Sequence, residues 1–242
     1  MGELTAFGWA HKAANVRARL AAALARHGRL VYSNSLGAEA MVLTDIIWTH
    51  LPQIDMFSID TGRLHEETYG LLQKLQQRYS RKIRVVYPDA RALEQLVVQR
   101  GINGFYENLA ARLECCRIRK VEPFRRAIRD YPAWITGVRR EQSPERALGQ
   151  PEEWDAEYGL YKLSPLIDWS EEEVWQYIRA HRLPYNALHD HQYPSIGCAP
   201  CTRAIQPGES RRAGRWWWEQ PESRECGLHP KHLPAAASAA VN

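Results

Sequence analysis

Apolar residues along the first part of the chain change their spacing in a repeating order. Up to His27 they recur at helical spacing, and the short apolar run at 30–32 then has the character of a buried strand. The same order of strand and helix follows twice more. The pattern predicts strands over 30–32, 56–59 and 83–87, and helices up to 27 and over 40–48, 65–79 and 91–100.

The regularity weakens after Gly104 and then partly returns. A basic helix is predicted over 117–129 and a strand over 134–136. The residues S-E-E-E at 170–173 form a capping box, which predicts a helix that ends near residue 181.

Strands that alternate with helices form right-handed βαβ units and a parallel sheet. We therefore expect an α/β fold, in which a single domain over 1–205 has a mainly parallel, twisted sheet flanked by helices. From Pro184 onward Pro, Gly, His and Trp are frequent and periodicity is lost. We expect loops there, and a C-terminal segment, 206–242, that ends in a mobile tail.

The 242 residues have an ordinary globular composition, with 45% hydrophobic and 25% charged residues. These fractions exclude a disordered chain, a collagen-like repeat and a disulfide-dense miniprotein. The longest uninterrupted apolar run, 20–25, is much shorter than the roughly 20 residues of a membrane-spanning helix. It is also shorter than the core of a secretory signal, which has about 7–15 residues. We expect a soluble, cytoplasmic protein.

Five cysteines fall into two close pairs and one single residue. Cys115 and Cys116 are adjacent, whereas Cys198 and Cys201 form a C-x-x-C motif. Thiolates from two separate segments can hold zinc or an iron–sulfur cluster. Adjacent side chains on a helix diverge by about 100°, which suits two irons of one cluster better than one tetrahedral zinc. The alternative is a set of buried free cysteines with a redox-active C-x-x-C.

Cys226 is the remaining cysteine, close to the C-terminus. Arg224 and His229 could lower the pKa of its thiol, whereas Glu225 opposes that effect. The local sequence alone therefore favours an inert surface thiol over a reactive one.

Small residues follow the first predicted strand, in the segment S-N-S-L-G-A-E at 33–39. Such a turn exposes backbone N–H groups and a positive helix end to an anion, and two serine hydroxyls add donors. The D-T-G segment at 60–62 ends the second strand at the same sheet edge and could face a ribose. Ordinary glycine-containing turns without a ligand explain both segments equally well.

Basic residues are concentrated between Cys115 and Arg146, and again at 211–215. Guanidinium groups suit the oxygens of phosphate and sulfate. Most of these side chains are nevertheless expected on a solvated face, so only those beside another motif are candidates for binding.

Together these segments resemble the sulfonucleotide reductases, from about Val31 to His229. The resemblance rests on S-N-S-L-G-A-E, D-T-G-R-L, C-C-R-I-R-K, T-G-V-R-R-E-Q-S-P-E-R, S-I-G-C-A-P-C-T-R, R-A-G-R-W-W-W and E-C-G-L-H, in this order. Members of that family reduce adenosine 5′-phosphosulfate (APS) or its 3′-phosphorylated form (PAPS). The four-cysteine pattern is typical of members that act on APS in sulfate assimilation toward cysteine. The resemblance also implies an adenine nucleotide α-hydrolase-like fold of the ATP-pyrophosphatase type.

The resemblance assigns roles to individual residues. The ligands of a [4Fe–4S] cluster would be Cys115, Cys116, Cys198 and Cys201. The catalytic residues would be Cys226 as nucleophile, Lys120 and His229. The substrate-binding residues would be Ser33, Ser35, Gly37, Asp60, Thr61, Gly62, Arg139, Arg140, Arg146, Arg212 and Arg215. Among Arg139, Arg140 and Arg146, the sequence leaves open which one contacts substrate.

The reaction implied is capture of the sulfuryl group of APS as an S-sulfocysteine, followed by release of sulfite by thioredoxin or a glutaredoxin-like donor. The family also suggests a homo-oligomer, with neither nucleic acid nor membrane as a partner. A PAPS or dual APS/PAPS reductase is the nearest alternative. An ATP-pyrophosphatase-type tRNA thiolation enzyme would need an S-G-G-x-D-S loop, which 33–39 lacks. A zinc-stabilised nucleic-acid-binding module fits poorly with a net charge of only +4.

Overall fold

The computed structural model describes residues 8–142, 146–220 and 228, and its centre is a six-stranded sheet with the order β3-β2-β1-β4-β6-β5. All neighbouring strands pair in parallel except β5 with β6, which are antiparallel. The strands are β1 (Leu30–Ser33), β2 (Asp55–Ile59), β3 (Arg84–Val86), β4 (Ala133–Ile135), β5 (Glu152–Asp155) and β6 (Leu160–Leu163). The predicted mainly parallel sheet is confirmed.

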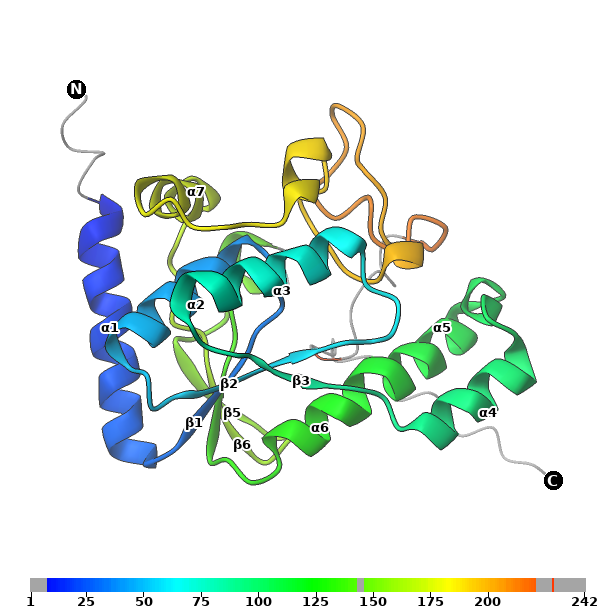
Figure 1. Cartoon of the computed structure of the whole chain (residues 1–242), viewed down its shortest axis with the longest axis horizontal. Helices are drawn as coiled ribbons and strands as arrows, with labels where there is room; N and C mark the ends of the chain where they lie inside the picture. Colours follow the sequence, from blue (N-terminus) through cyan, green and yellow to red (C-terminus); the bar gives the residue numbers. More distant parts are fainter. Residues whose placement is uncertain (1–7, 143–145, 221–227, 229–242) are drawn as a thin grey trace.

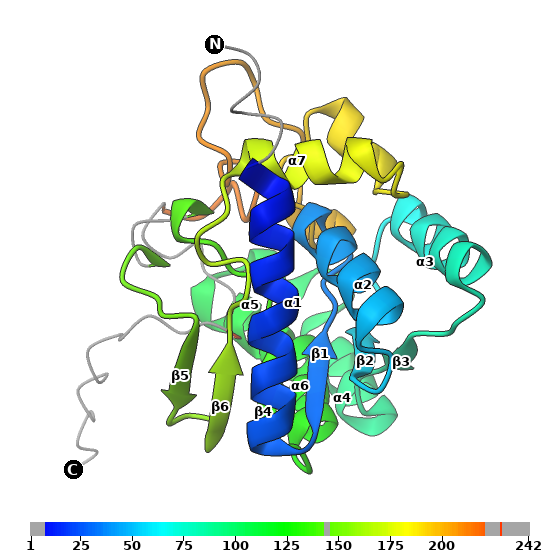
Figure 2. The ribbon, with the colours of Figure 1, turned by 90° about the vertical axis from the view of Figure 1, so that its left-hand side faces the viewer.

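Helices cover both faces of the sheet (Figures 1 and 2). The helices are α1 (Gly8–His27), α2 (Ala38–His50), α3 (Glu66–Tyr79), α4 (Ala90–Arg100), α5 (Leu109–Cys116), α6 (Glu122–Ile128) and α7 (Glu171–Ala180). The larger core cluster joins α1, α2, α3 and α7 to one face, and the smaller one joins α6 to the other. None of the helices within these residues is long and apolar enough to cross a bilayer.

Strand β1 shows how the sequence divides the core between the two faces. Leu30 and Tyr32 belong to the larger cluster, whereas Val31 between them belongs to the smaller one. Successive side chains of a strand point to opposite faces, so an uninterrupted apolar run is what a strand buried on both faces needs.

One helix and two strands differ from the prediction. The basic helix begins at Leu109 instead of 117, and a π-helical turn, η2 (Arg117–Val121), joins α5 to α6. Strands β5 and β6 were not predicted. The edge strand β5 has the sequence E-E-W-D, which has no apolar alternation, and its Trp154 is 57% exposed.

The capping box of α7 is confirmed: Ser170 Oγ accepts from the Glu173 N–H at 3.1 Å, and Glu173 accepts from the Ser170 N–H at 2.7 Å.

The segment that follows residue 205 packs back onto the chain before it. Thr202 and Arg215 form an antiparallel bridge, and the Arg203 N–H donates to the Gly214 carbonyl at 2.9 Å. A Cβ on Gly214 would lie 2.2 Å from the carbonyl oxygen of Arg203, so only glycine allows this approach. The described part of 206–220 is thereby joined to the cysteine-bearing turn before it.

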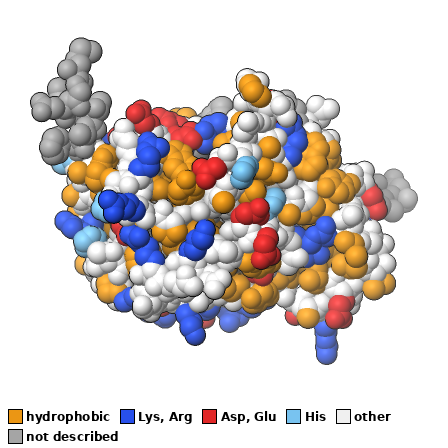
Figure 3. All heavy atoms as spheres, turned by 45° about the horizontal axis from the view of Figure 1, so that its top comes forward, with side chains coloured by type: hydrophobic (Ala, Val, Ile, Leu, Met, Phe, Trp, Pro, Cys, Tyr) orange, Lys and Arg blue, Asp and Glu red, His pale blue; other side chains and the backbone are white. Residues whose placement is uncertain are grey.

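Charged side chains of both signs are interspersed over the face drawn in Figure 3. The small net charge of +4 is therefore not gathered into one basic surface on that face.

Candidate active site

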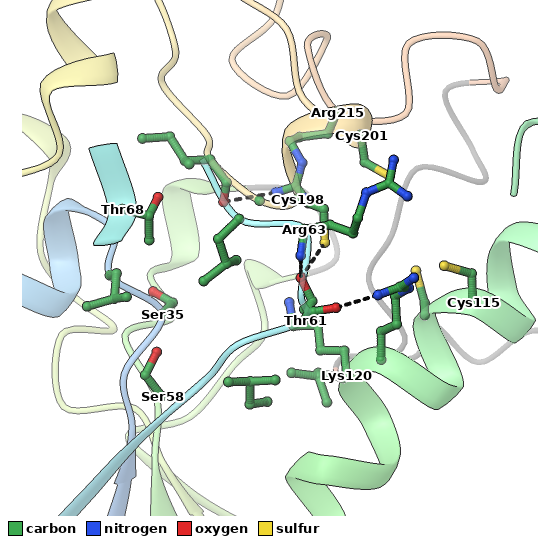
Figure 4. Close-up of a pocket in the computed structure, with 18 of the residues that line it drawn as sticks. Ser35, Ser58, Thr61, Arg63, Thr68, Cys115, Lys120, Cys198, Cys201 and Arg215 are labelled. Atoms are coloured by element: carbon green, nitrogen blue, oxygen red, sulfur yellow. Dashed lines mark hydrogen bonds between the residues drawn. The ribbon is translucent and has the colours of Figure 1, made fainter. Parts of the chain in front are cut away.

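A pocket opens at the carboxyl ends of β1, β2 and β4, where the strand order reverses direction from β1. This is the switch point at which open α/β sheets bind ligands. One wall comes from the strand ends and includes Ser33, Ser35, Ser58, Thr61 and Thr136. The opposite wall comes from α5, η2 and the loops at 196–201 and 215–216. Figure 4 shows Ser35 and Ser58 on one side of the pocket and the cysteines and Arg215 on the other.

The loop after β1 is held by its own side chains. Asn34 is buried, accepts from the Leu36 N–H at 2.8 Å and donates to Thr44 Oγ1 at 2.8 Å. Leu36 has a positive φ of 59°, a conformation that a non-glycine residue adopts only when its surroundings hold it. Ser33 and Ser35 line the pocket, whereas Gly37 caps α2 outside the lining. Their contact with substrate stays a prediction.

The D-T-G segment after β2 forms a tight turn in which only Thr61 lines the pocket. Asp60 accepts from the Gly62 N–H at 2.7 Å and from the Tyr69 hydroxyl at 3.0 Å. Burial and this carboxylate raise the pKa of Tyr69 to about 12. Gly62 has a φ of 71°, the left-handed region that favours glycine. Asp60 and Gly62 therefore shape the turn, and Thr61 presents its hydroxyl.

The four paired cysteines all line this pocket. Cys115 and Cys116 end α5. Cys198 precedes the short helix η6 (Ala199–Cys201), and Cys201 is its last residue. Thr61 Oγ1 lies 3.2 Å from Cys198 Sγ, which ties the turn after β2 to the C-x-x-C segment.

Burial raises the pKa of the thiols of Cys115 and Cys201, against a smaller opposing effect of Arg119 on Cys115 and of Arg215 on Cys201. Metal binding needs thiolates, so iron would have to displace these protons.

Within the described ranges, no three His, Cys, Asp or Glu side chains are arranged around a position for one metal ion. The donor set nevertheless fits a cluster with several irons, because four thiols from two segments meet in one pocket. The indole N–H of Trp216, which lines the same pocket, is buried without a hydrogen-bond acceptor in the part of the chain that the structure describes. A sulfur-rich anionic group would supply one.

Cationic side chains come to the pocket from η2 and from the segment after β2. Lys120 is part of η2 and its side chain is half-buried. It has no hydrogen-bond or ion-pair partner within residues 8–142, 146–220 and 228. Arg119 donates to the Thr61 carbonyl at 2.7 Å and is held close to Cys115. Arg63 donates to the Ile102 carbonyl at 2.9 Å and to Asn103 Oδ1 at 2.8 Å.

Arg215 is buried in the second wall. Its guanidinium group lies 4.6 Å from the centre of the Trp216 ring and donates to the Ile196 carbonyl at 3.3 Å. A Cβ on Gly197 would lie 2.2 Å from Nη2 of Arg215, so the backbone there makes room for the guanidinium. Arg215 thus brings a firmly held positive charge to the pocket. Its contact with substrate stays a prediction.

The other predicted arginines do not line this pocket. Arg139 pairs with Glu39 at 2.8 Å, Arg140 pairs with Asp168, and Arg146 donates to Gln142. Arg212 lies one turn before Arg215, and the backbone N–H of Arg215 donates to the Arg212 carbonyl at 2.9 Å. Their contact with substrate stays a prediction. Cys226 and His229 lie outside the described residues.

Arg63, Arg112 and Arg119 are the cationic lining residues that sequence reasoning missed. Arg63 and Arg119 stand directly beside the motifs D-T-G and C-C, and that adjacency was the available signal. The sequence gives no such signal for Arg112. It lies on α5, where the apolar periodicity is weak, and its charge is buried against Glu219 from a distant segment.

Comparison with known proteins gives a consistent result. Residues 29–204 match the phosphoadenosine phosphosulfate reductase domain. The adenosine 5′-phosphosulfate reductase of Allochromatium vinosum is 54% identical to this chain, over 84% of this chain and 80% of that protein. The adenosine 5′-phosphosulfate reductase of Burkholderia cepacia is 50% identical, over 84% of this chain and 82% of that protein.

Solved structures show the same fold. A phosphoadenylyl-sulfate reductase from Candida auris, in a phosphate complex, has a TM-score of 0.68 at 26% identity, covering 79% of this chain and 90% of that one. The Candida glabrata FMN adenylyltransferase, with FAD and inorganic pyrophosphate, has a TM-score of 0.57 at 16% identity, covering 93% and 76%. The predicted α/β fold of the adenine nucleotide α-hydrolase-like type is confirmed.

Proposed function

Because the chain belongs to the phosphoadenosine phosphosulfate reductase domain family, whose similar members are oxidoreductases acting on sulfur groups, we propose that it reduces APS to sulfite and AMP in sulfate assimilation. The observation that carries this proposal is the convergence of four cysteines, Lys120 and Arg215 on one pocket at the carboxyl edge of the sheet. The identities of 54% and 50% to APS reductases support APS as the substrate over PAPS.

We place the nucleoside along the strand ends, near Ser33, Ser35 and Thr61, with the phosphosulfate toward Lys120 and Arg215. Asp60 and Gly62 would support the nucleoside side through the turn that they form with Thr61. This orientation puts the two anionic groups of APS against the cationic wall and leaves the adenosine beside hydroxyl and apolar groups.

In the proposed reaction the Cys226 thiolate attacks the sulfur of the sulfuryl group. A sulfur–sulfur bond forms as the bond from that sulfur to the bridging oxygen breaks, and AMP leaves with the electron pair. A dithiol donor such as thioredoxin, or a glutaredoxin-like protein, then attacks Cys226 Sγ. Sulfite leaves with the electron pair, and Cys226 and the donor are joined by a mixed disulfide. The second thiol of the donor then attacks the donor sulfur of that bond, which releases the Cys226 thiolate and leaves the donor as a disulfide. His229, three residues after Cys226, would accompany the nucleophile.

The main barrier to this step is electrostatic, because an anionic thiolate approaches an anionic sulfate. Two unit charges 4 Å apart repel by about 4 kcal/mol at an effective dielectric constant of about 20. One cation at a similar distance offsets most of that cost. Lys120 is suited to this role, because it has no carboxylate partner within the described ranges.

Cys115, Cys116, Cys198 and Cys201 would hold a [4Fe–4S] cluster, which would supply a fixed anionic centre beside Lys120 without passing electrons to substrate. Lys120 would then be oriented between that centre and the sulfuryl group. We further propose, from the family resemblance, a cytoplasmic homo-oligomer.

Substitution of one proposed ligand tests the cofactor. Cys198→Ser is expected to lose iron and sulfite production together, measured by iron analysis and by turnover. The matched control is Cys226→Ser, which should keep its iron and lose only turnover. Full iron content in Cys198→Ser would remove Cys198 from the ligand set.

Turnover with APS and with PAPS at equal concentrations tests the substrate. We expect a kcat/KM for APS at least a hundredfold above that for PAPS. A preference for PAPS would overturn the assignment.

A further inference from the structure

Aromatic side chains pack around the four paired cysteines. Phe105, Cys201 and Trp216 form a third core cluster, and Trp218 and the other three paired cysteines pack against it. The centre of the Tyr106 ring lies 4.4 Å from that of Phe105 and 4.5 Å from that of Trp218. Phe105 lines the pocket, whereas Tyr106 and Trp218 lie outside its lining. The cysteine sulfurs therefore share one apolar environment with these rings.

Tyr106 is fastened to the turn that carries the C-x-x-C motif. Its hydroxyl group donates to the carbonyl of Pro200 at 2.6 Å, although the two residues are 94 positions apart in the sequence. The next residue, Cys201, is only 8% exposed. A second bond holds the same turn, because the Ala199 N–H donates to the Arg63 carbonyl at 2.7 Å. The C-x-x-C turn is thus joined both to the segment after β2 and to Tyr106.

The short helix that presents Tyr106, η1 (Gly104–Tyr106), is itself firmly held. Directly before it, Asn103 Oδ1 accepts from the Arg63 guanidinium at 2.8 Å. A Cβ on the glycine that begins η1 would lie 2.5 Å from Cβ of Arg100, so only glycine lets η1 approach the end of α4 this closely. Tyr106 therefore reaches the C-x-x-C turn from a fixed support.

We propose that Tyr106 is a positioning residue of the iron–sulfur site: it fixes the C-x-x-C turn through Pro200 and, with Phe105 and Trp218, screens Cys201 from solutes that do not enter through the pocket. The inference rests on the [4Fe–4S] cluster of the proposed function. Iron is lost from a thiolate site when water or a chelator reaches the metal, and the shell of side chains around the ligands governs that access.

The ring and the hydroxyl group of Tyr106 contribute separately to this role. The side chain is 41% exposed, so one part of the ring meets solvent while the rest packs on Phe105 and Trp218. Loss of the hydroxyl group alone removes the bond to Pro200 and keeps the screen. Loss of the ring removes both. The proposal therefore predicts a graded response to two substitutions at this position.

Removal of iron from the iron-loaded enzyme by bathophenanthroline disulfonate, a ferrous chelator, tests the inference. Tyr106→Ala is expected to lose iron about tenfold faster than the wild type, at the lower end of the effects of residues beside metal ligands. Tyr106→Phe keeps the ring and should lose iron about threefold faster, as expected for one hydrogen bond. Both variants should start with the iron content of the wild type.

Tyr161→Ala is the matched control. Tyr161 on β6 is 38% exposed, and the centre of its ring lies 5.2 Å from that of Trp154. Its removal therefore deletes an equally exposed, ring-packed tyrosine away from the C-x-x-C turn, and iron should leave this variant at the wild-type rate. An acceleration equal to that of Tyr106→Ala would reflect general loosening and would overturn the inference.

Alkylation of the iron-free full chain by iodoacetamide, followed at each cysteine by mass spectrometry, tests the screen without the cluster. Tyr106→Ala should raise the rate at Cys201 about tenfold and leave that at Cys115 within about twofold, because a local opening exposes only the segment that it releases. Cys115 lies on α5 and not on the turn that Tyr106 holds. Equal increases at both cysteines would contradict a positioning role.

Wild-type rates of iron loss and of Cys201 alkylation in Tyr106→Ala would overturn the role of Tyr106. A wild-type enzyme that binds no iron would instead overturn the cluster of the proposed function, and the alkylation rates would still decide whether Tyr106 screens Cys201.

Discussion

Two groups of basic residues differ in what lies opposite their charge. Arg139 and Arg140 face carboxylates, Glu39 at 2.8 Å and Asp168. Arg63 and Arg119 instead donate to the carbonyls of Ile102 and Thr61. A carboxylate cancels the charge of its partner, whereas a carbonyl satisfies the N–H group and leaves the net charge in place. The arginines available to an anion are therefore those beside the pocket, although the T-G-V-R-R motif places two arginines side by side in the sequence.

Among the basic residues, Lys120→Ala should have the largest effect on activity. It removes a cation that has no ion-pair partner within the described residues, so kcat/KM should fall by about a hundredfold or more, comparable to loss of an oxyanion-stabilising donor. Single-turnover kinetics measures the loss, and Lys120→Arg should recover part of it. Unchanged kinetics in Lys120→Ala would contradict the role of the unpaired cation.

Arg139→Ala should act mainly on stability. The Arg139 side chain is 3% exposed, and its removal leaves Glu39 without its cation, at a cost of about 3 kcal/mol in the free energy of unfolding. Adding Glu39→Gln should recover more than half of that loss in denaturant unfolding. If the double variant unfolds like the wild type yet has lost turnover, Arg139 binds substrate and the comparison fails.

The same pair predicts a dependence on pH. Burial alone would raise the pKa of Glu39, but the charge and hydrogen bond of Arg139, together with hydrogen bonds from Gln142 and from the backbone, hold that pKa below its ordinary value. The stabilisation by this pair is therefore complete above about pH 4.3, the unfolded value, and is lost as pH falls through the folded value. The difference in unfolding free energy between wild type and Arg139→Ala should shrink in acid. A difference that is constant down to pH 3 would contradict the pairing.

Arg63→Ala should have a moderate effect. Its guanidinium is held by Ile102 and Asn103 and lies 5.5 Å from the centre of the Phe105 ring. Removing one fixed cation from the rim should raise KM for APS about tenfold and leave kcat within about threefold. Arg63→Lys keeps the charge, so its KM should lie between those of the wild type and Arg63→Ala. A wild-type KM in Arg63→Ala would contradict a role of Arg63 in binding APS.

Arg140→Ala should have the smallest effect. Its ion pair with Asp168 is partly exposed, at 37% and 39%, and such pairs contribute about 0–1 kcal/mol. We expect kcat/KM within twofold of the wild type and a small change in melting temperature. A loss as large as that of Lys120→Ala would show that Arg140 leaves Asp168 to bind substrate.

Elements that depend on local pattern were predictable from the sequence. The first three strands and their helices follow from apolar spacing, and the serines after β1 lie at the pocket because the carboxyl ends of parallel strands share one edge. The edge strand β5 was not predictable, because its pairing with β6 depends on a partner in space and not on its own E-E-W-D sequence.

The cationic wall was only half predictable for a related reason. The π-helical turn η2 adds a residue to the helix, so the side chains after Cys116 are rotated relative to a regular α-helix. Arg119 and Lys120 both line the pocket as a result. Periodicity at 3.6 residues per turn cannot locate such a change, and the buried pair of Arg112 with Glu219 likewise depends on contacts between distant segments.

The central claim is that four cysteines hold iron while Cys226 alone captures the sulfuryl group. The most direct test is to incubate the iron-loaded enzyme with APS and no thiol donor, and to map adducts by mass spectrometry while AMP and sulfite are measured. The account predicts one AMP released per chain, a sulfo group on Cys226, and no sulfite until a dithiol is added. Sulfite released before the dithiol, or an adduct on another residue, would contradict it.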